Sequence, residues 1–244
     1  PNYEHNQSWI AAQDGSLTAR GLGPSFEVIS PVMYGEAGMR EAKRIHKALV
    51  KAGAVTHRTA GNHIHMGINH SARWNRMSDK KKAEVGKRLA NVYSKYQKVI
   101  DSLLSNVRCS GVAGGRCVLN LGSWILQGRV EFRQVGNTLK WENIEGMTAI
   151  FKAMLNVCFN ENHPSWKPRF EDFASDLSMR QSTFDSMVSY LNLGSKTVAW
   201  GEARIIHLRD TYQTNKDMRN SVLRVSLNTP NAETVILRRF GEVA

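Results

Sequence analysis

The sequence predicts a globular domain that combines β-strands with amphipathic helices, and three observations support this class. Residues 129–135 alternate charged and apolar side chains with the period of two that is typical of a strand. Residues 36–52, 78–104 and 141–159 repeat apolar side chains at helical spacing. The composition, 41% hydrophobic and 22% charged, is that of a folded soluble protein rather than a disordered one.

Bulk properties limit the class of function. At 244 residues the chain is long enough for a sizeable core, and we expect one main domain. Three cysteines without a CxxC pair argue against zinc or a disulfide framework and fit a reducing cytoplasm. No apolar run approaches a membrane span and no signal region is evident, so we expect no membrane association. The net charge of +12 predicts attraction to the phosphates of a nucleotide, a nucleic acid or another polymer.

The functional interpretation depends on the strand within residues 128–137, which glycines bracket at both ends. Its two faces carry different side chains: Arg129, Glu131 and Arg133 on one side, and Val130, Phe132 and Val135 mostly on the other. Side chains at i and i+2 of a strand lie about 6.6 Å apart, so this charged row could meet a polyanion together with its metal ion. The alternative is an ordinary solvated sheet face with ion pairs along the row.

Two further short strands carry polar side chains that suit metal or phosphate binding. Residues 61–68 place His63 and His65 on one face and apolar side chains on the other. Two histidines at this spacing can ligate a metal ion or donate to phosphate oxygens, and a structural role is the alternative. Residues 26–30 form a strand that Pro31 stops. Its Glu27 is either a metal ligand or an edge glutamate that faces water.

The remaining elements complete the expected organisation. A helix over 184–193 should end at Gly194, and the segments 204–208, 221–227 and 234–240 are β-like. The proline-containing stretch 163–168 is a break in the helical pattern. We therefore expect a core over residues 1–160 and a C-terminal extension of mixed helix and strand, packed on that core, over 161–244.

Four motifs occur in a particular order: Asp14-Gly15-Ser16, Glu27-Val28-Ile29-Ser30-Pro31, His63-Ile64-His65, and Glu131-Phe132-Arg133 followed by a helix. This ordered set resembles the amidoligase family of carboxylate–amine ligases, which is similar to glutamine synthetase and glutamate–cysteine ligase. The likeness covers about residues 8–158. It implies an α+β fold in which a curved antiparallel sheet carries the site on its concave face and helices pack on the other, as in glutamine synthetase.

The resemblance also implies a reaction. ATP would phosphorylate a carboxylate, and an amine would then displace the phosphate to form an amide or isopeptide bond. Divalent cations, Mg²⁺ or Mn²⁺, would bridge the nucleotide oxygens. The expected partners are therefore a nucleotide and unidentified carboxylate and amine substrates, with a peptide or protein among the candidates.

Site residues follow from the same resemblance. Glu27, Glu131 and His63 would hold the metal, although Mg²⁺ prefers oxygen ligands, so His63 and His65 could contact phosphate instead. The remaining roles fall to the other motif residues: Arg133 and, as the weaker candidate, Arg129 would bind phosphate or the acyl-phosphate, and Asp14 and Ser16 would orient nucleotide or substrate.

One feature of the family is missing. Its members ordinarily begin with a strand that bears two glutamates in a G-x-E-x-E pattern, and nothing in residues 1–8 matches it. Three explanations are open: a processed or truncated chain, a partner chain that supplies the strand, or a protein that kept the fold and lost catalysis. The last gives the alternative function, a structural or polyanion-binding protein with nucleic acid as the obvious polyanion.

Overall fold

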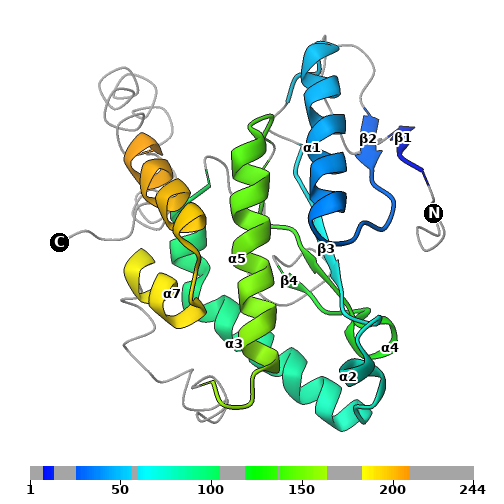
Figure 1. The fold of residues 1–244 in the computed structure, drawn as a ribbon, viewed down its shortest axis with the longest axis vertical. Coiled ribbons are helices and arrows are strands. Elements are labelled where there is room, and N and C mark those ends of the chain that lie inside the picture. The colour runs from blue at the N-terminus through cyan, green and yellow to red at the C-terminus, as the bar shows by residue number, and fades with distance from the viewer. Residues whose placement is uncertain are drawn as a thin grey trace, which may run out of the picture.

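The computed structural model describes residues 8–13, 26–56, 60–104, 119–136, 138–163 and 183–208. Helices and strands are mixed, as predicted (Figure 1). The strands are β1 (Ile10–Gln13), β2 (Phe26–Ile29), β3 (Ile64–Gly67), β4 (Leu119–Asn120) and β5 (Arg129–Phe132). The helices are α1 (Gly35–Lys51), α2 (Ala72–Asn75), α3 (Asp79–Ser102), α4 (Trp124–Gln127), α5 (Trp141–Phe159), α7 (Phe184–Leu191) and a further helix over residues 195–208.

The strands form two small antiparallel sheets. Among the described residues β1 pairs with β2, while the other sheet has the order β3-β5-β4 with β5 in the centre. The antiparallel pairing agrees with the prediction, and the curved sheet stays a prediction. The ladders in the described part of the chain are four residues long or shorter.

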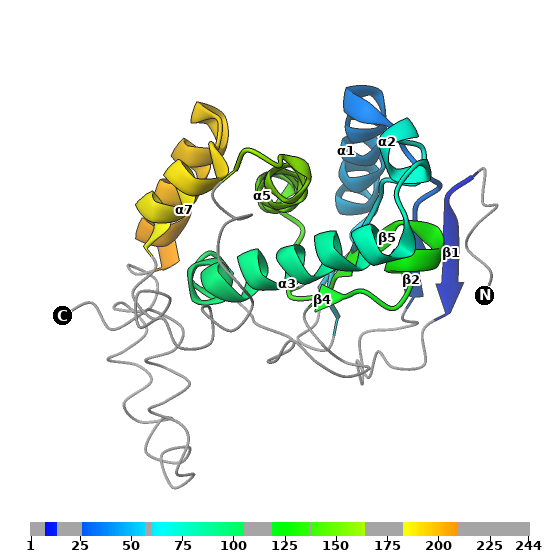
Figure 2. The same cartoon turned by 90° about the horizontal axis from the view of Figure 1, so that it is seen from below.

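The apolar face of the three-stranded sheet anchors the core. Val130 and Phe132 are fully buried, as the alternating pattern predicts. The ring of Phe132 stacks on Phe151 of α5 with centroids 4.0 Å apart and lies 5.9 Å from Tyr93 of α3. Helices α3 and α5 therefore cover one face of the sheet and leave the charged face of β5 on the other side (Figure 2).

Local sequence signals explain where several elements begin and end. The hydroxyl of Ser78 accepts a hydrogen bond from Lys81 N–H and caps the start of α3, as expected. Gly128 ends α4 with φ near 59°, a left-handed conformation that glycine adopts without steric cost. This turn directs the chain from α4 straight into β5, so it helps to place Arg129 and Glu131.

The described part of the C-terminal region packs on α3 and α5. Phe184, Met187 and Leu191 of α7 belong to the same buried cluster as the sheet and the long helices. The expected strand at 204–208 is wrong, because these residues continue the helix over 195–208. Buried Arg204 donates from Nε to the carbonyl of Leu103, just after α3. Segments 221–227 and 234–240 lie outside the described residues.

Helix α1 is peripheral. It has the predicted amphipathic pattern, yet none of its residues is buried. Its contact with α5 includes the rings of His46 and Trp141, with centroids 5.9 Å apart. α1 and the β1–β2 pair lie at one end of the molecule, opposite α7 and the 195–208 helix (Figures 1 and 2). No helix in the described part of the chain is both long and apolar enough to cross a membrane.

Candidate metal and phosphate site

The pairing register of the three-stranded sheet brings the predicted motifs together. His65 on β3 lies directly opposite Glu131 on β5, and Asn120 on β4 lies opposite Glu131 from the other side. The apolar neighbours of His65, Ile64 and Met66, pack against the core. Since side chains alternate along a strand, the histidines must then face away from the core, on the side of Glu131.

The carboxylate of Glu131 is the centre of a polar cluster. Its Oε1 atom lies 3.2 Å from Nδ1 of His63, 3.7 Å from Nε2 of His65 and 3.4 Å from Nε of Arg133. Its Oε2 atom accepts a hydrogen bond of 2.9 Å from the side-chain amide of Asn120. Glu131 is mostly covered, with 14% of its side chain exposed, whereas half of the His65 side chain is exposed. The cluster is therefore anchored in the sheet and open to solvent at the histidines.

Burial of His65 favours its neutral imidazole. Burial lowers the pKa of His65 below its usual value; Glu131 opposes this shift, and the positive charges of Arg129 and Arg133 add to it. A neutral imidazole has a free nitrogen lone pair, which is the form that ligates metal ions. The geometry and the electrostatics of His65 thus suit the same role.

The two arginines make the face net positive. Arg133 approaches Glu131 directly, while a guanidinium nitrogen of Arg129 lies 3.5 Å from the hydroxyl of Ser123. Two guanidinium groups against one carboxylate leave one positive charge when the histidines are neutral. Such a surface attracts phosphate oxygens, and the planar guanidinium can bind them with two hydrogen bonds.

The donor set tests which ion would fit. His63, His65 and Glu131 each offer one ligand atom, and these three atoms lie within 4.8 Å of one another. Among the described residues, these are the His, Cys, Asp and Glu side chains that come close enough together to hold an ion. Two imidazole nitrogens and one carboxylate oxygen suit Mn²⁺ or another first-row transition metal better than Mg²⁺. The residues therefore fit a divalent cation, with Mn²⁺ preferred over Mg²⁺.

Of the other predicted residues, one lies on the two-stranded sheet and two lie outside the described part of the chain. Glu27 lies on β2 of the two-stranded sheet, opposite Ala12, and does not belong to the group around Glu131. Its role as a metal ligand stays a prediction. Asp14 and Ser16 lie outside the described residues, so their role in binding nucleotide or substrate also stays a prediction.

Sequence reasoning missed one polar residue next to the site, Asn120, and one on the buried side just after β5, Gln134. Asn120 escaped notice because its strand is two residues long and follows a glycine-punctuated stretch. Gln134 is fully buried; it accepts a hydrogen bond from the hydroxyl of Tyr93 and donates one to Asp101, both on α3. The period-two pattern could have found Gln134, because it shares the parity of buried Val130 and Phe132.

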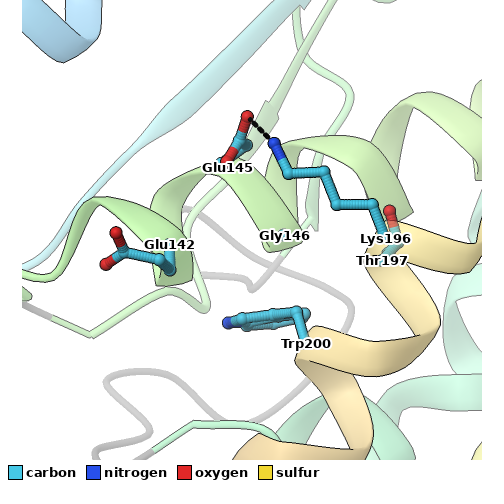
Figure 3. A pocket seen from close by; sticks show the side chains of 6 residues that line it. All are labelled: Glu142, Glu145, Gly146, Lys196, Thr197 and Trp200. Atoms are coloured by element: carbon cyan, nitrogen blue, oxygen red, sulfur yellow. Dashed lines mark hydrogen bonds and ion pairs between the residues drawn. The ribbon is translucent and has the colours of Figure 1, made fainter.

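A small hollow elsewhere on the molecule is separate from this cluster. It has a volume of about 80 Å³ and lies between α5 and the helix over 195–208. Figure 3 shows the indole of Trp200 lying along α5 at Gly146, and Lys196 paired with Glu145 at 2.7 Å. None of the described residues predicted for the site lines this hollow. The polar cluster around Glu131 and this hollow are therefore separate features.

Comparison with known proteins adds no assignment: no family model matches the chain, and no significant match was found among curated proteins or solved structures.

Proposed function

We propose that this protein is an ATP- and divalent-cation-dependent carboxylate–amine ligase related in fold to glutamine synthetase. The observation that carries this proposal is the position of the Glu131 carboxylate, which lies between the imidazoles of His63 and His65 and the guanidinium of Arg133. These residues come from motifs about 65 positions apart in the chain and meet through the β3–β5 register. If the chain is related to the amidoligases, its histidine motif and its Glu131 motif are expected to lie in one site, and here their side chains lie together.

Each side chain has a role that its environment supports. Glu131, His63 and His65 would hold a divalent cation, which when bound would supply positive charge to offset that of phosphate oxygens. Arg133 and Arg129 would bind oxygens of the transferred phosphoryl group and neutralise the charge that develops on them. Burial lowers the pKa of His65, which favours the neutral form whose lone pair can bind the ion.

The chemistry proceeds in two steps that balance. A carboxylate oxygen of the acid substrate forms a bond to the γ-phosphorus of ATP while the bond from that phosphorus to the β-phosphate oxygen breaks and releases ADP. The amine nitrogen then forms a bond to the acyl carbon, the bond from that carbon to the phosphate oxygen breaks and releases inorganic phosphate, and the nitrogen loses a proton to solvent. The chain's contribution is positioning and charge, because both steps pass through states rich in negative oxygen.

The test measures nucleotide binding and turnover. Calorimetry with ATP and Mn²⁺ should show a single binding event, and ADP release should require both a carboxylate and an amine from a substrate panel. Glu131→Gln should abolish the release while the protein remains folded by circular dichroism. The Asn143→Ala variant alters hydrogen bonds on α5 instead and serves as the matched control. Absence of ATP binding by the unaltered protein would overturn the ligase proposal.

A second candidate function is the binding of a polyanion by the same fold without catalysis. The net charge of +12 and the positive sheet face around Arg129 and Arg133 favour it. Nucleic acid is the polyanion to test first, through the dependence of its affinity on salt. Binding that persists in Glu131→Gln, together with the absence of ATP turnover, would favour this function over ligation.

A further inference from the structure

The two oxygens of Glu131 have different surroundings. Oε1 faces His63, His65 and Arg133 at 3.2–3.7 Å, so each of its neighbours is a ring nitrogen or a cation. Oε2 faces Asn120, whose Nδ2 donates to it at 2.9 Å. A carboxylate in solution would exchange its two oxygens freely. Here the sheet makes them inequivalent.

The orientation of Asn120 is fixed by the chain that follows it. The backbone N–H of Gly122 donates to Oδ1 of Asn120 at 2.9 Å. Because a backbone N–H can only donate, the amide oxygen must take that side and the NH₂ group must point toward Glu131. The β4–β5 pairing sets Asn120 and Glu131 opposite each other, so the two side chains stand side by side on one face.

We propose that Asn120 is a positioning residue that makes Glu131 a one-oxygen metal ligand. Its amide occupies Oε2 and leaves Oε1 to share an ion with His63 and His65. This inference rests on the proposed metal-binding function of the cluster. It identifies the oxygen of Glu131 that binds the ion, and it explains why the other oxygen does not. An amide that hydrogen-bonds to a ligating carboxylate also fixes the orientation of that carboxylate. This raises the affinity for the ion although the amide does not contact the ion.

The arrangement has a consequence for metal choice. Large cations such as Ca²⁺ take six to eight oxygen ligands and often use both oxygens of a glutamate. A glutamate limited to one oxygen, beside two imidazoles, suits a smaller transition metal that accepts nitrogen. Asn120 therefore disfavours Ca²⁺ at this site, although it is not itself a ligand.

The experiment uses Co²⁺ as the probe, because its visible absorption reports coordination directly and does not depend on catalysis. We expect the full chain to bind one Co²⁺ at the cluster. In Asn120→Ala both glutamate oxygens become available, so the absorption should weaken as the coordination number rises. The dissociation constant should increase by about 10- to 100-fold. Ca²⁺ should compete with Co²⁺ more effectively than it does in the unaltered protein.

Two further variants keep the test decisive. Asn143→Ala removes an amide that bonds Thr138 and Trp200 away from the sheet, so it should lower stability and leave the Co²⁺ spectrum and affinity unchanged. Asn120→Leu has a similar size, adds no charge and cannot donate to Glu131, so it should also alter the spectrum and admit Ca²⁺, even where the alanine variant folds poorly.

The outcomes separate the two proposals. If the unaltered protein binds Co²⁺ and neither Asn120 variant changes its spectrum or affinity, the role of Asn120 is overturned and the metal site stands. If the unaltered protein binds no Co²⁺, the metal site itself is overturned, and the inference about Asn120 falls with it. A changed spectrum in both Asn120 variants, with Asn143→Ala unchanged, supports the inference.

Discussion

Glu131 is the residue whose charge organises the cluster, and its replacement is the most direct test of metal binding. Glu131→Gln keeps the shape of the side chain and an oxygen that can accept from Asn120, but it removes the negative charge next to the imidazoles. A neutral amide oxygen is a much weaker ligand for a divalent cation. We expect the dissociation constant for Mn²⁺, measured by calorimetry, to rise by at least about 100-fold, beyond the range for loss of an outer-shell partner. An unchanged constant would place the ion elsewhere.

His65 gives a prediction for the dependence of stability on pH. Its pKa is lower in the folded chain than its usual 6.5, chiefly because of burial. Below pH 6.5 the unfolded chain therefore binds more protons at this position, and the free energy of unfolding falls as the pH drops toward the folded pKa. Above pH 6.5 the group contributes no slope. Because half of the side chain is exposed, the effect is small.

The measurement compares urea unfolding of the unaltered protein and His65→Asn between pH 5 and 8. The difference in free energy of unfolding between the two should be constant above about pH 6.5 and change in favour of the variant below it. A difference that instead changed in favour of the variant as the pH rose above 6.5 would mean that the folded state favours the charged imidazole. This result would remove the electrostatic support for His65 as a neutral ligand.

At the scale of elements, α5 and the helix over 195–208 come close to each other at Gly146, where Trp200 lies. A Cβ atom added there would lie 2.3 Å from Cδ2 and Cε3 of the Trp200 indole, far inside normal contact. Gly146→Ala must push the two helices apart, and we expect a loss of ~1–3 kcal/mol in the free energy of unfolding, measured with urea. In a Trp200→Leu background the same change should cost less, because the clash is with the ring. Equal costs in both backgrounds would contradict the contact.

The elements also show which parts of the fold local sequence can predict. Trp141–Phe159 is α5 as expected, because its apolar side chains repeat over nineteen residues and are buried along one stripe. Residues 204–208 were misread as a strand, because Arg-Ile-Ile-His-Leu is too short for its period to be decided. These residues continue the helix over 195–208, whose Arg204 side chain donates to the carbonyl of Leu103.

The same limit applies to the candidate site. Alternation along each strand correctly placed His63 with His65, and Glu131 with Arg133, on polar faces. It could not predict that β3 pairs with β5 in the register that puts His65 opposite Glu131, because register depends on long-range packing. The position of Asn120 next to Glu131 could not be predicted from the sequence for the same reason. It depends on the pairing of β4 with β5 and not on the residues that flank Asn120.

At the scale of the whole molecule, part of the excess positive charge comes from a row of lysines on α1. Lys43, Lys47 and Lys51 are spaced four residues apart, so they rise along one side of the helix in steps of about 6 Å. None of the three forms an ion pair with another described residue, whereas Arg40 and Arg44 pair with Glu36 and Glu41. His46 contacts Trp141 of α5 on the side of α1 that faces the protein. Lys47 and Lys51 are exposed, and Lys43 is partly buried.

This row gives the polyanion hypothesis a quantitative test. If single-stranded nucleic acid binds along α1, each lysine that neutralises a phosphate should release counterions. The logarithm of the affinity would then fall with the logarithm of salt concentration by about 0.7 per contact. Replacing the three lysines together by glutamine should flatten that slope by roughly 2, without changing Mn²⁺ binding at Glu131. A variant whose slope matches that of the unaltered protein would show that the lysines serve only as a solvated face. A shallow slope in the unaltered protein would remove the electrostatic basis of polyanion binding and leave ligation as the function to pursue.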